Sequence, residues 1–238
     1  MKQEIRHQVI LNTLDSRGYA SIEALAEDAI RKEFVELCAS LFARGYCVGG
    51  AGNVSQRLPD ESLLISPKGS CLGRLDSVEL SKADMDGKHL SGREPTIELP
   101  FHIEVYKARP DCQAVVHLHS TYATAISCLA DLDMEDALRP FTPYYVMKVG
   151  KLPVAPYYRP GSLELAATVG ETARKSPTFL LANHGTVVCG DSLVDAVNRA
   201  EELEETAKLH FLLLSSGKSV RYFTSQEIAE LTAASGRK

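Results

Sequence analysis

Short apolar runs alternate with turn-forming residues over residues 49–120, and this pattern limits the possible folds most strongly. The run LLI at 63–65 ends at SPKG (66–69), and AVV at 114–116 leads into His117. Apolar runs of this length, bounded by proline and glycine, are typical of strands. The stretch therefore predicts several short strands of one sheet.

Helical signals interrupt and follow these strands. The prolines before FHIEVYKARPD (101–111) and its apolar spacing predict a helix of about ten residues. Ser162 and Ser192 are predicted N-caps of two later helices, which should reach about Arg174 and about Ser215. Because strands and helices follow no strict βαβ order, the sequence indicates a layered α/β or α+β domain.

The first 44 residues have apolar side chains at helical spacing, interrupted at Arg17-Gly18. Their pattern is similar to the opening two helices of a bacterial winged-helix repressor, which leaves a DNA-binding role as an alternative. No recognition helix follows before the pattern changes. We therefore interpret the segment as a helical extension that packs on the core.

Charge and hydropathy exclude several classes of partner. The 31 acidic and 26 basic residues are mixed along the chain, with a formal net charge of -5, so no nucleic-acid partner is expected. No apolar stretch approaches the roughly 20 residues that span a bilayer, and the N-terminus lacks a signal-peptide pattern. The six cysteines form no C-x-x-C pair and are expected to be reduced, mostly buried thiols. A cytoplasmic protein without a membrane partner is predicted.

Three histidines are the candidate metal ligands. VVHLHS places His117 and His119 two residues apart in a predicted strand, so both rings project from one face. His184 precedes a glycine in a turn between two more predicted strands, 178–182 and 186–189. Three protein ligands and one open position are typical of catalytic zinc, although three ordinary hydrogen-bonded histidines are the alternative. The other histidines are expected at the surface or on helix faces: His7, His89, His102 and His210.

Two turns and one glutamate are candidates for substrate binding. GGAGN (49–53) can bring backbone amides close to an anion, and SPKG (66–69) offers a hydroxyl, a cation and a flexible residue. Either turn alone is more often a plain chain reversal, and neither matches a nucleotide fingerprint. Glu98 lies between apolar residues, a setting that suits a carboxyl group to proton transfer, whereas most glutamates are merely solvated.

Five short motifs occur in one order: GNVS (52–55), SPKG (66–69), PTIE (95–98), HLH (117–119) and NHG (183–185). Together they resemble the class II aldolase/adducin family. The resemblance implies a three-layer α/β/α domain around a mixed central sheet, with residues 29–238 as the catalytic domain and 1–28 as a helical extension. It also implies one Zn²⁺ per subunit, or Mn²⁺ or Co²⁺ instead, held by the three histidines, and a homotetramer with active sites at subunit boundaries.

The resemblance also implies roles for individual residues. In the family's fuculose-phosphate aldolases, the positions matching Gly52-Asn53, Lys68-Gly69 and Thr96-Ile97 hold the substrate phosphate. The glutamate matching Glu98 is the acid/base and can ligate the metal before substrate arrives. Tyr144 of a neighbouring subunit aligns approximately with the aldolase tyrosine and is a second candidate proton donor.

Two positions depart from the aldolase pattern. Ile97 stands where the aldolases carry a second serine, and Lys68 replaces a threonine, so a full charge replaces a hydroxyl. We expect an anion pocket that is retained but rebuilt for a carboxylate or for a phosphate in another pose. Arg159 in YYRPG is a possible further contact of this anion, and a surface arginine is the alternative.

Within the family, SPKGSCLGRLD (66–76) and PYYVMKVGKLPVAPYYRPG (143–161) are similar to the 3-oxo-tetronate 4-phosphate decarboxylase branch. This similarity implies that an acidic 3-keto sugar acid loses carbon dioxide through a metal-stabilised enediolate and gives dihydroxyacetone phosphate. Three alternatives stay open. They are a class II aldolase cleaving a hydroxylated keto sugar phosphate, a sugar-phosphate epimerase, and an adducin-like interaction module without enzymatic activity.

Overall fold

The computed structural model describes residues 22–234. Of the predicted extension over residues 1–28, residues 1–21 lie outside the described residues. From Ile22 onward, one helix runs without a break past residues 28 and 29, so the division of the chain at that point stays a prediction.

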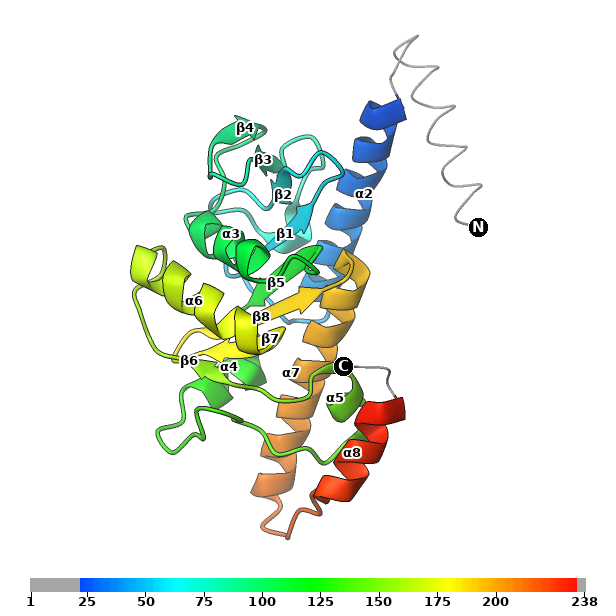
Figure 1. Cartoon of the computed structure of the whole chain (residues 1–238), viewed down its shortest axis with the longest axis vertical. Helices are drawn as coiled ribbons and strands as arrows, with labels where there is room; N and C mark the ends of the chain where they lie inside the picture. Colours follow the sequence, from blue (N-terminus) through cyan, green and yellow to red (C-terminus); the bar gives the residue numbers. More distant parts are fainter. Residues whose placement is uncertain (1–21, 235–238) are drawn as a thin grey trace.

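Within the described residues, eight short strands form one mixed sheet in the order β4-β3-β2-β1-β5-β8-β7-β6 (Figure 1). Their bounds are β1 Asn53–Arg57, β2 Leu63–Ile65, β3 Ser81–Ala83, β4 His89–Ser91, β5 Ala114–Leu118, β6 Val154–Ala155, β7 Thr178–Leu181 and β8 Gly185–Gly190. Neighbouring strands are antiparallel except β6 and β7, which are parallel. The strands predicted at 63–65, 114–116, 178–182 and 186–189 are confirmed as β2, β5, β7 and β8.

The helices of the described part are α2 Ile22–Ala43, α3 Leu99–Ala108, α4 Thr121–Ser127, α5 Pro143–Lys148, α6 Leu163–Lys175, α7 Leu193–Ser215 and α8 Ser225–Ala234, with a short 3-10 helix η1 Leu72–Arg74. The helix predicted after Pro100 is α3. Ser162 and Ser192 are confirmed as N-caps, because their hydroxyls accept hydrogen bonds from the backbone N–H groups of Leu165 and Asp195.

Each face of the sheet carries its own apolar core. Side chains of α2, α4, α5 and α7 pack with Val54, Val116 and Val188 on one face. On the other face, α3 and α6 pack with Val115 and Val187. Figure 1 shows α3 and α6 on one side of the strands and α2 and α7 on the other. Because neighbouring residues of β5 alternate between the two cores, the molecule is the predicted three-layer α/β/α domain.

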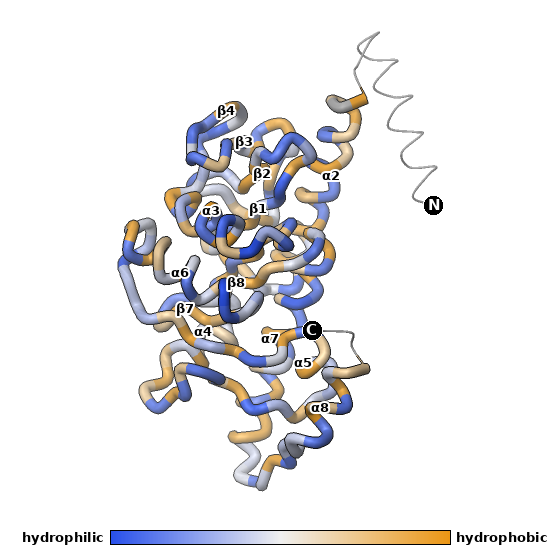
Figure 2. Tube along the Cα trace, in the orientation of Figure 1, coloured by the Kyte–Doolittle hydropathy of each residue, from blue (hydrophilic) through white to orange (hydrophobic). Residues whose placement is uncertain are grey.

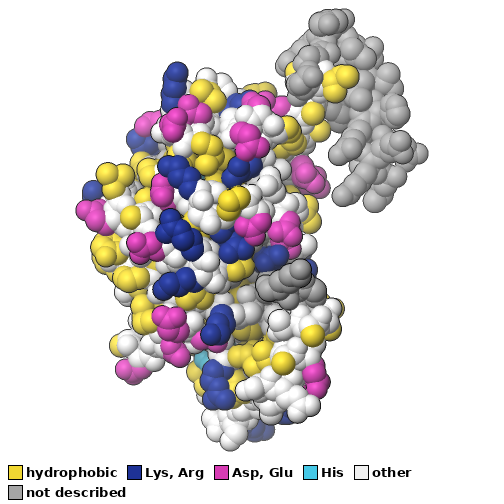
Figure 3. Space-filling model, in the orientation of Figure 1, with side chains coloured by type: hydrophobic (Ala, Val, Ile, Leu, Met, Phe, Trp, Pro, Cys, Tyr) yellow, Lys and Arg dark blue, Asp and Glu magenta, His cyan; other side chains and the backbone are white. Residues whose placement is uncertain are grey.

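The helices that cover the sheet are amphipathic. Along α2 the trace alternates between hydrophobic and hydrophilic residues (Figure 2), as expected when one helix face packs on the core. Basic, acidic and hydrophobic side chains are interspersed on the face seen in Figure 3. None of the helices in residues 22–234 combines the length and the apolar character needed to cross a membrane. All six cysteines are free thiols, and all but Cys128 are buried, as predicted.

Candidate metal centre and active site

The central strand β5 and the residue directly after it carry two of the three candidate ligands. His117 lies in register with Asn53 of β1 on one side and with Val187 of β8 on the other, so it is fixed by two ladders. The ring of His117 is completely buried and meets Phe101 of α3 edge to face at 5.3 Å between centroids. His119 follows two residues later on the same face, as the alternation of a strand predicts.

The turn between β7 and β8 delivers the third histidine. Asn183 has a φ of 55°, a left-handed conformation that asparagine tolerates better than most residues. A Cβ at Gly185 would lie 2.3 Å from the Leu118 carbonyl oxygen and 3.1 Å from Cδ2 of His119. Only glycine therefore fits after His184. In the NHG motif, asparagine suits the left-handed backbone conformation, histidine is the candidate ligand, and glycine allows the chain to pass close to Leu118.

The three rings converge on one point. Their centroids are 4.8–4.9 Å apart in pairs, and the ring planes are steeply inclined to one another. The Nε2 atoms of His117 and His119 are 3.0 Å apart. Among the described residues these three histidines form a group that could hold a metal ion, with one ligand atom from each lying within 4.8 Å of the others.

Hydrogen bonding and burial prepare the rings as neutral ligands. Nδ1 of His117 donates to the Thr186 carbonyl oxygen at 2.8 Å, which leaves its Nε2 as a bare lone pair. Burial holds the pKa of His117 well below its ordinary value, and the nearby rings of His119 and His184 lower it further. Burial also lowers the pKa of His119 and of His184. All three imidazoles are therefore uncharged at neutral pH.

Glu98 stands beside the histidines at the start of α3. The Thr96 hydroxyl accepts a hydrogen bond from the Glu98 backbone N–H at 3.3 Å, and Pro100 occupies the first turn of the helix. The Glu98 carboxylate oxygens lie 3.5 Å from Nε2 of His117 and 3.6 Å from Nε2 of His184. Nδ2 of Asn53 donates to Oε2 of Glu98 at 2.7 Å. The buried carboxylate thus faces the point where the rings meet.

The donor set fits a divalent metal ion. Oε1 of Glu98 and Nδ1 of His184 are buried and have no hydrogen-bond partner among the described residues. Burying a carboxylate oxygen without a partner is costly, and a cation bound between the rings would offset that cost. Three neutral imidazoles with an adjacent carboxylate are also a donor set typical of Zn²⁺ and related divalent ions.

Three loops that the sequence singled out lie together beside this cluster. A Cβ at Gly52 would lie 2.8 Å from the His117 carbonyl oxygen, so this loop requires glycine where it crosses β5. The backbone N–H of Lys68 donates to the Glu94 carbonyl oxygen at 2.9 Å, which joins the SPKG loop to the segment before α3. A Cβ at Gly50 would contact the Gly69 carbonyl oxygen at 3.5 Å. The structure thus brings the three predicted anion-binding segments into one region.

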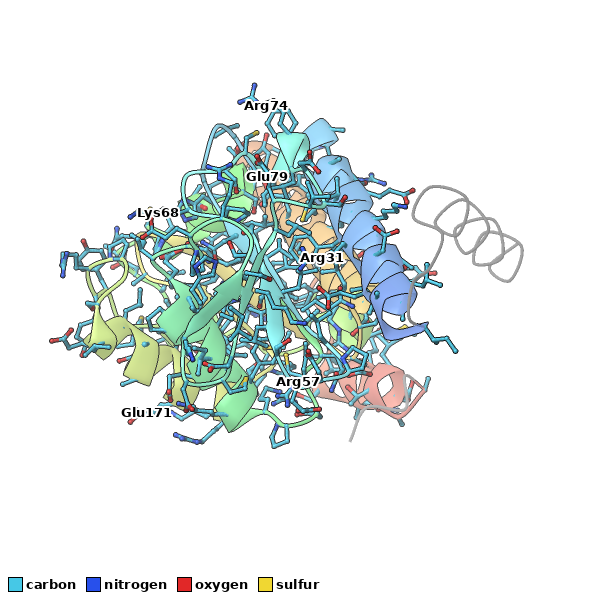
Figure 4. All side chains as sticks on the ribbon, turned by 90° about the horizontal axis from the view of Figure 1, so that it is seen from above. Arg31, Arg57, Lys68, Arg74, Glu79 and Glu171 are labelled. Atoms are coloured by element: carbon cyan, nitrogen blue, oxygen red, sulfur yellow. The ribbon has the colours of Figure 1, made fainter. Side chains whose placement is uncertain are left out.

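The Lys68 side chain has a partner that the sequence analysis missed. Its ammonium group pairs with the Glu94 carboxylate at 3.1 Å, and both side chains are more than half exposed. Lys68 lies at the periphery of the molecule in the view of Figure 4. An exposed ion pair of this kind is weak, so separating the Lys68 ammonium group from the Glu94 carboxylate costs little free energy.

Two predicted site residues lie outside the histidine cluster of this chain. Arg159 is exposed, but its loop packs beside Glu98, since a Cβ at Gly161 would lie 3.4 Å from the Ile97 carbonyl oxygen. Tyr144 is 63% exposed on α5. Val146, on the same helix as Tyr144, lines a cavity together with Cys112. Cys112 precedes the start of β5, whereas the histidines lie near the end of that strand.

His102 is the functional candidate to which the sequence analysis gave no role. It was expected at a surface or on a helix face; it is on α3, but its side chain is completely buried. Nε2 of His102 is 2.5 Å from Oδ1 of Asn53, the residue that holds Glu98. A usable signal was present in the sequence, because Glu98, His102 and Tyr106 recur every four residues and so fall on one face of the helix and its N-cap.

Comparisons with known proteins agree with this geometry. The family profile described as Class II Aldolase and Adducin N-terminal domain matches residues 32–211. The chain is 53% identical over 208 residues to the 3-oxo-tetronate 4-phosphate decarboxylase of Escherichia coli, covering 87% of this chain and 97% of that protein. It is 38% identical over 187 residues to the L-fuculose phosphate aldolase of Methanococcus vannielii, covering 79% and 98% respectively.

A solved structure has the same architecture. The crystal structure of YgbL from Escherichia coli superimposes with a TM-score of 0.84 at 52% identity, covering 87% of this chain and 99% of the other. With the matching profile spanning most of the described residues, and with relatives matched over nearly their whole length, the protein belongs to the class II aldolase and adducin family.

Proposed function

We propose that this protein is a zinc-dependent carboxy-lyase that converts a 3-oxo-tetronate 4-phosphate to dihydroxyacetone phosphate and carbon dioxide. One observation carries the lyase chemistry: the Glu98 carboxylate lies 3.5 and 3.6 Å from Nε2 of two histidines in a three-histidine cluster. The choice of substrate is supported by 53% identity to a protein named for that decarboxylation. The non-catalytic, adducin-like alternative is disfavoured because a complete set of metal donors is present.

The reaction needs an electron acceptor and a proton donor at adjacent carbons. The bond between C1 and C2 of the substrate breaks, C1 leaves as carbon dioxide, and the electron pair stays on C2 beside the C3 ketone. A divalent ion held by His117, His119 and His184 would supply a Lewis acid that stabilises this electron pair. Glu98 gives a proton to C2, which completes dihydroxyacetone phosphate. Glu98 then recovers its proton from solvent.

The substrate phosphate is proposed to bind at the three loops. Lys68 supplies the positive charge, and the Thr96 hydroxyl and the backbone around Gly52-Asn53 and Gly69 supply further hydrogen-bond donors. Among the described residues, the Lys68 ammonium group is paired with the exposed Glu94 carboxylate, which it would have to release. Arg159 is proposed as an additional contact, because its loop packs against Ile97.

A homotetramer in the cytoplasm is proposed as the functional form. Tyr144 is 63% exposed on α5 and lies outside the histidine cluster of its own chain, so the proposal is that Tyr144 of a second subunit acts in proton transfer. The free thiols of all six cysteines suit a reducing compartment.

The direct test is to incubate the zinc-loaded protein with 3-oxo-tetronate 4-phosphate and to measure carbon dioxide, dihydroxyacetone phosphate and aldehyde products. Equal amounts of carbon dioxide and dihydroxyacetone phosphate are expected. Aldehyde without carbon dioxide, from this substrate or from fuculose 1-phosphate, would instead establish the aldolase alternative. Release of neither product at saturating Zn²⁺, Mn²⁺ or Co²⁺ would refute the lyase.

Matched histidine variants separate the metal centre from general effects. His117→Ala removes a buried ligand and should abolish both metal retention and turnover. Since loss of an outer partner alone costs about 10- to 100-fold in metal affinity or activity, loss of a ligand should cost more. His89→Ala, which changes an exposed histidine of β4, should leave both unchanged.

A further inference from the structure

A continuous chain of buried hydrogen bonds runs from Glu98 into the core between α3 and β1. Asn53 Nδ2 contacts Glu98 Oε2 at 2.7 Å, and Asn53 Oδ1 contacts His102 Nε2 at 2.5 Å. His102 Nδ1 contacts the Ser55 hydroxyl at 2.7 Å, which contacts the Tyr106 hydroxyl at 2.8 Å. All five side chains are buried.

The chemistry of each group fixes the direction of this chain. Oε2 of Glu98 accepts a hydrogen bond whether the carboxyl group is ionised or carries its proton on Oε1, so the Asn53 amide must turn its NH₂ group toward Glu98 and its oxygen toward His102. His102 must then carry a hydrogen on Nε2. If the ring is neutral, its Nδ1 is an acceptor, so Ser55 donates to it and accepts from Tyr106. Every donor in the chain therefore points toward Glu98.

Burial keeps the His102 ring neutral. Desolvation lowers the pKa of His102 to about 3, because the ring is completely enclosed. The ring also stacks on Phe101 at 4.5 Å between centroids, with an interplanar angle of 14°. The packing therefore favours one ring orientation and one charge state.

We infer that His102 is a positioning residue, whose Nε2–H holds the Asn53 amide so that Glu98 is fixed through Oε2 and uses Oε1 for proton transfer. Oε1 of Glu98 is the oxygen without a hydrogen-bond partner among the described residues, and it lies 3.6 Å from Nε2 of His184. The Asn53 amide cannot pass a proton along the chain. The four residues behind Glu98 therefore orient the carboxylate and do not conduct protons away from it.

The first test concerns the tautomer of His102 and is independent of any reaction. In full-length protein labelled with ¹⁵N-histidine, the His102 signal is identified by its loss in the His102→Gln variant. At neutral pH we expect a proton on Nε2 and none on Nδ1. A proton on Nδ1, whether or not Nε2 also carries one, would overturn the inference, whatever the enzyme is found to catalyse.

The second test is kinetic and rests on the proposed decarboxylation. His102→Leu keeps a side chain of similar size but removes the donor, and should lower kcat by about 10- to 100-fold with little change in KM or in bound metal. His102→Gln restores an N–H donor and should recover most of kcat. Tyr106→Phe, at the far end of the chain, should cost less than His102→Leu.

The outcomes separate the two proposals. A wild-type protein that does not decarboxylate refutes the proposed function, while the tautomer of His102 still decides the inference. The positioning role is wrong if the wild type is active and His102→Leu has the same kcat. It is also wrong if His102→Gln recovers none of the kcat that His102→Leu lost. If His102→Leu does not fold, the tautomer and the Tyr106→Phe kinetics decide, and unchanged kcat in Tyr106→Phe would show that the chain does not act as a unit.

Discussion

The ion pair between Lys68 and Glu94 gives a test of substrate binding at the scale of single residues. Removing the lysine charge in Lys68→Met should raise KM by about tenfold, with a smaller effect on kcat, since a hydrogen bond to a charged group contributes about 1.5–3 kcal/mol. Glu94→Gln releases Lys68 from its partner and should lower KM or leave it unchanged. Steady-state kinetics on the phosphorylated substrate measure both.

Lys107→Met is the matched control for Lys68→Met. Lys107 forms an ion pair with Glu104 at 3.1 Å and is half exposed, like Lys68, but it lies in the last turn of α3. The KM of Lys107→Met should equal that of the wild type. If Lys68→Met does not raise KM, the anion binds elsewhere.

Single residues also mark the limit of sequence analysis. His117 and His119 were predictable, because alternation in a strand sends both rings to one face. His184 was predictable because it precedes a glycine in a tight turn between two apolar runs, and the structure adds that a side chain at Gly185 would clash with the Leu118 carbonyl oxygen. Glu94 and His102 were missed, because their roles depend on which loop and strand lie opposite them. Pairing between segments distant in sequence carries no periodic signal.

At the scale of elements, a buried carboxylate fixes the helix that follows the strand carrying His117. The Glu204 side chain of α7 is buried and accepts hydrogen bonds from the backbone N–H groups of Tyr122 and Ala123, at 2.8 and 2.9 Å. These N–H groups belong to the first turn of α4, which begins two residues after His119. A negative charge at a helix N-terminus is stabilising.

Glu204→Gln should therefore reduce the free energy of unfolding by roughly 1–3 kcal/mol, because one buried N–H group loses its acceptor and faces an amide donor. Urea unfolding of the metal-free protein measures this loss. Glu230→Gln, at an exposed position of α8, should change stability little. Equal stability of the two variants would mean that Glu204 does not anchor α4.

The helix α2 is held to the sheet by a network of charges centred on Lys82 of β3. Lys82 contacts Glu27 of α2 at 2.9 Å and Asp60 at 2.8 Å. Arg31 of α2, labelled in Figure 4, contacts the backbone carbonyl oxygens of Ser77 and Leu80 as well as Glu27. The network joins the first described helix to one end of the sheet.

This network predicts a specific dependence of stability on pH. Hydrogen bonds from Lys82 and Ser62 lower the pKa of Asp60 from 3.8 to about 2. Because the folded-state pKa lies below the unfolded-state value, the stabilisation is complete above pH 3.8 and is lost as the pH falls toward 2. Lys82→Met should weaken this acid-dependent loss and cost roughly 1 kcal/mol or less at neutral pH, since exposed partners are screened. Urea midpoints measured across acid pH would show no difference from the wild type if the network were inactive.

At the scale of the whole molecule, the proposed role of Tyr144 can be tested with mixed oligomers, because it requires two subunits. His117→Ala subunits keep Tyr144, and Tyr144→Phe subunits keep the metal ligands. If Tyr144 acts across a subunit boundary, mixed oligomers of two nearly inactive variants should regain up to roughly a quarter of wild-type activity, as expected for random pairing of intact halves. Activity of mixed samples that does not exceed the sum of the separate variants would contradict a shared site.

The three-layer arrangement was predictable, but the order of its strands was not. Apolar runs and N-caps indicated β2, β5, β7, β8 and the helices α3, α6 and α7. The position of β5 between β1 and β8 depends on long-range pairing, and it is this pairing that sets Asn53 beside His117. The two-residue strand β6 is too short to give a recognisable pattern.

The strand that carries His117 and the loops proposed to bind the anion are different elements, and this has a consequence for how enzymes of this architecture can diversify. His117 lies between two neighbouring strands, whereas the Lys68 loop and the segment before α3 are connections between elements, joined by the hydrogen bond from the Lys68 N–H to the Glu94 carbonyl oxygen. Under the proposed function, substitutions in those connections should change which acid or phosphate is accepted while the geometry of the three histidines is inherited unchanged. A mutant library restricted to the two connections would sample new substrates on a constant metal centre.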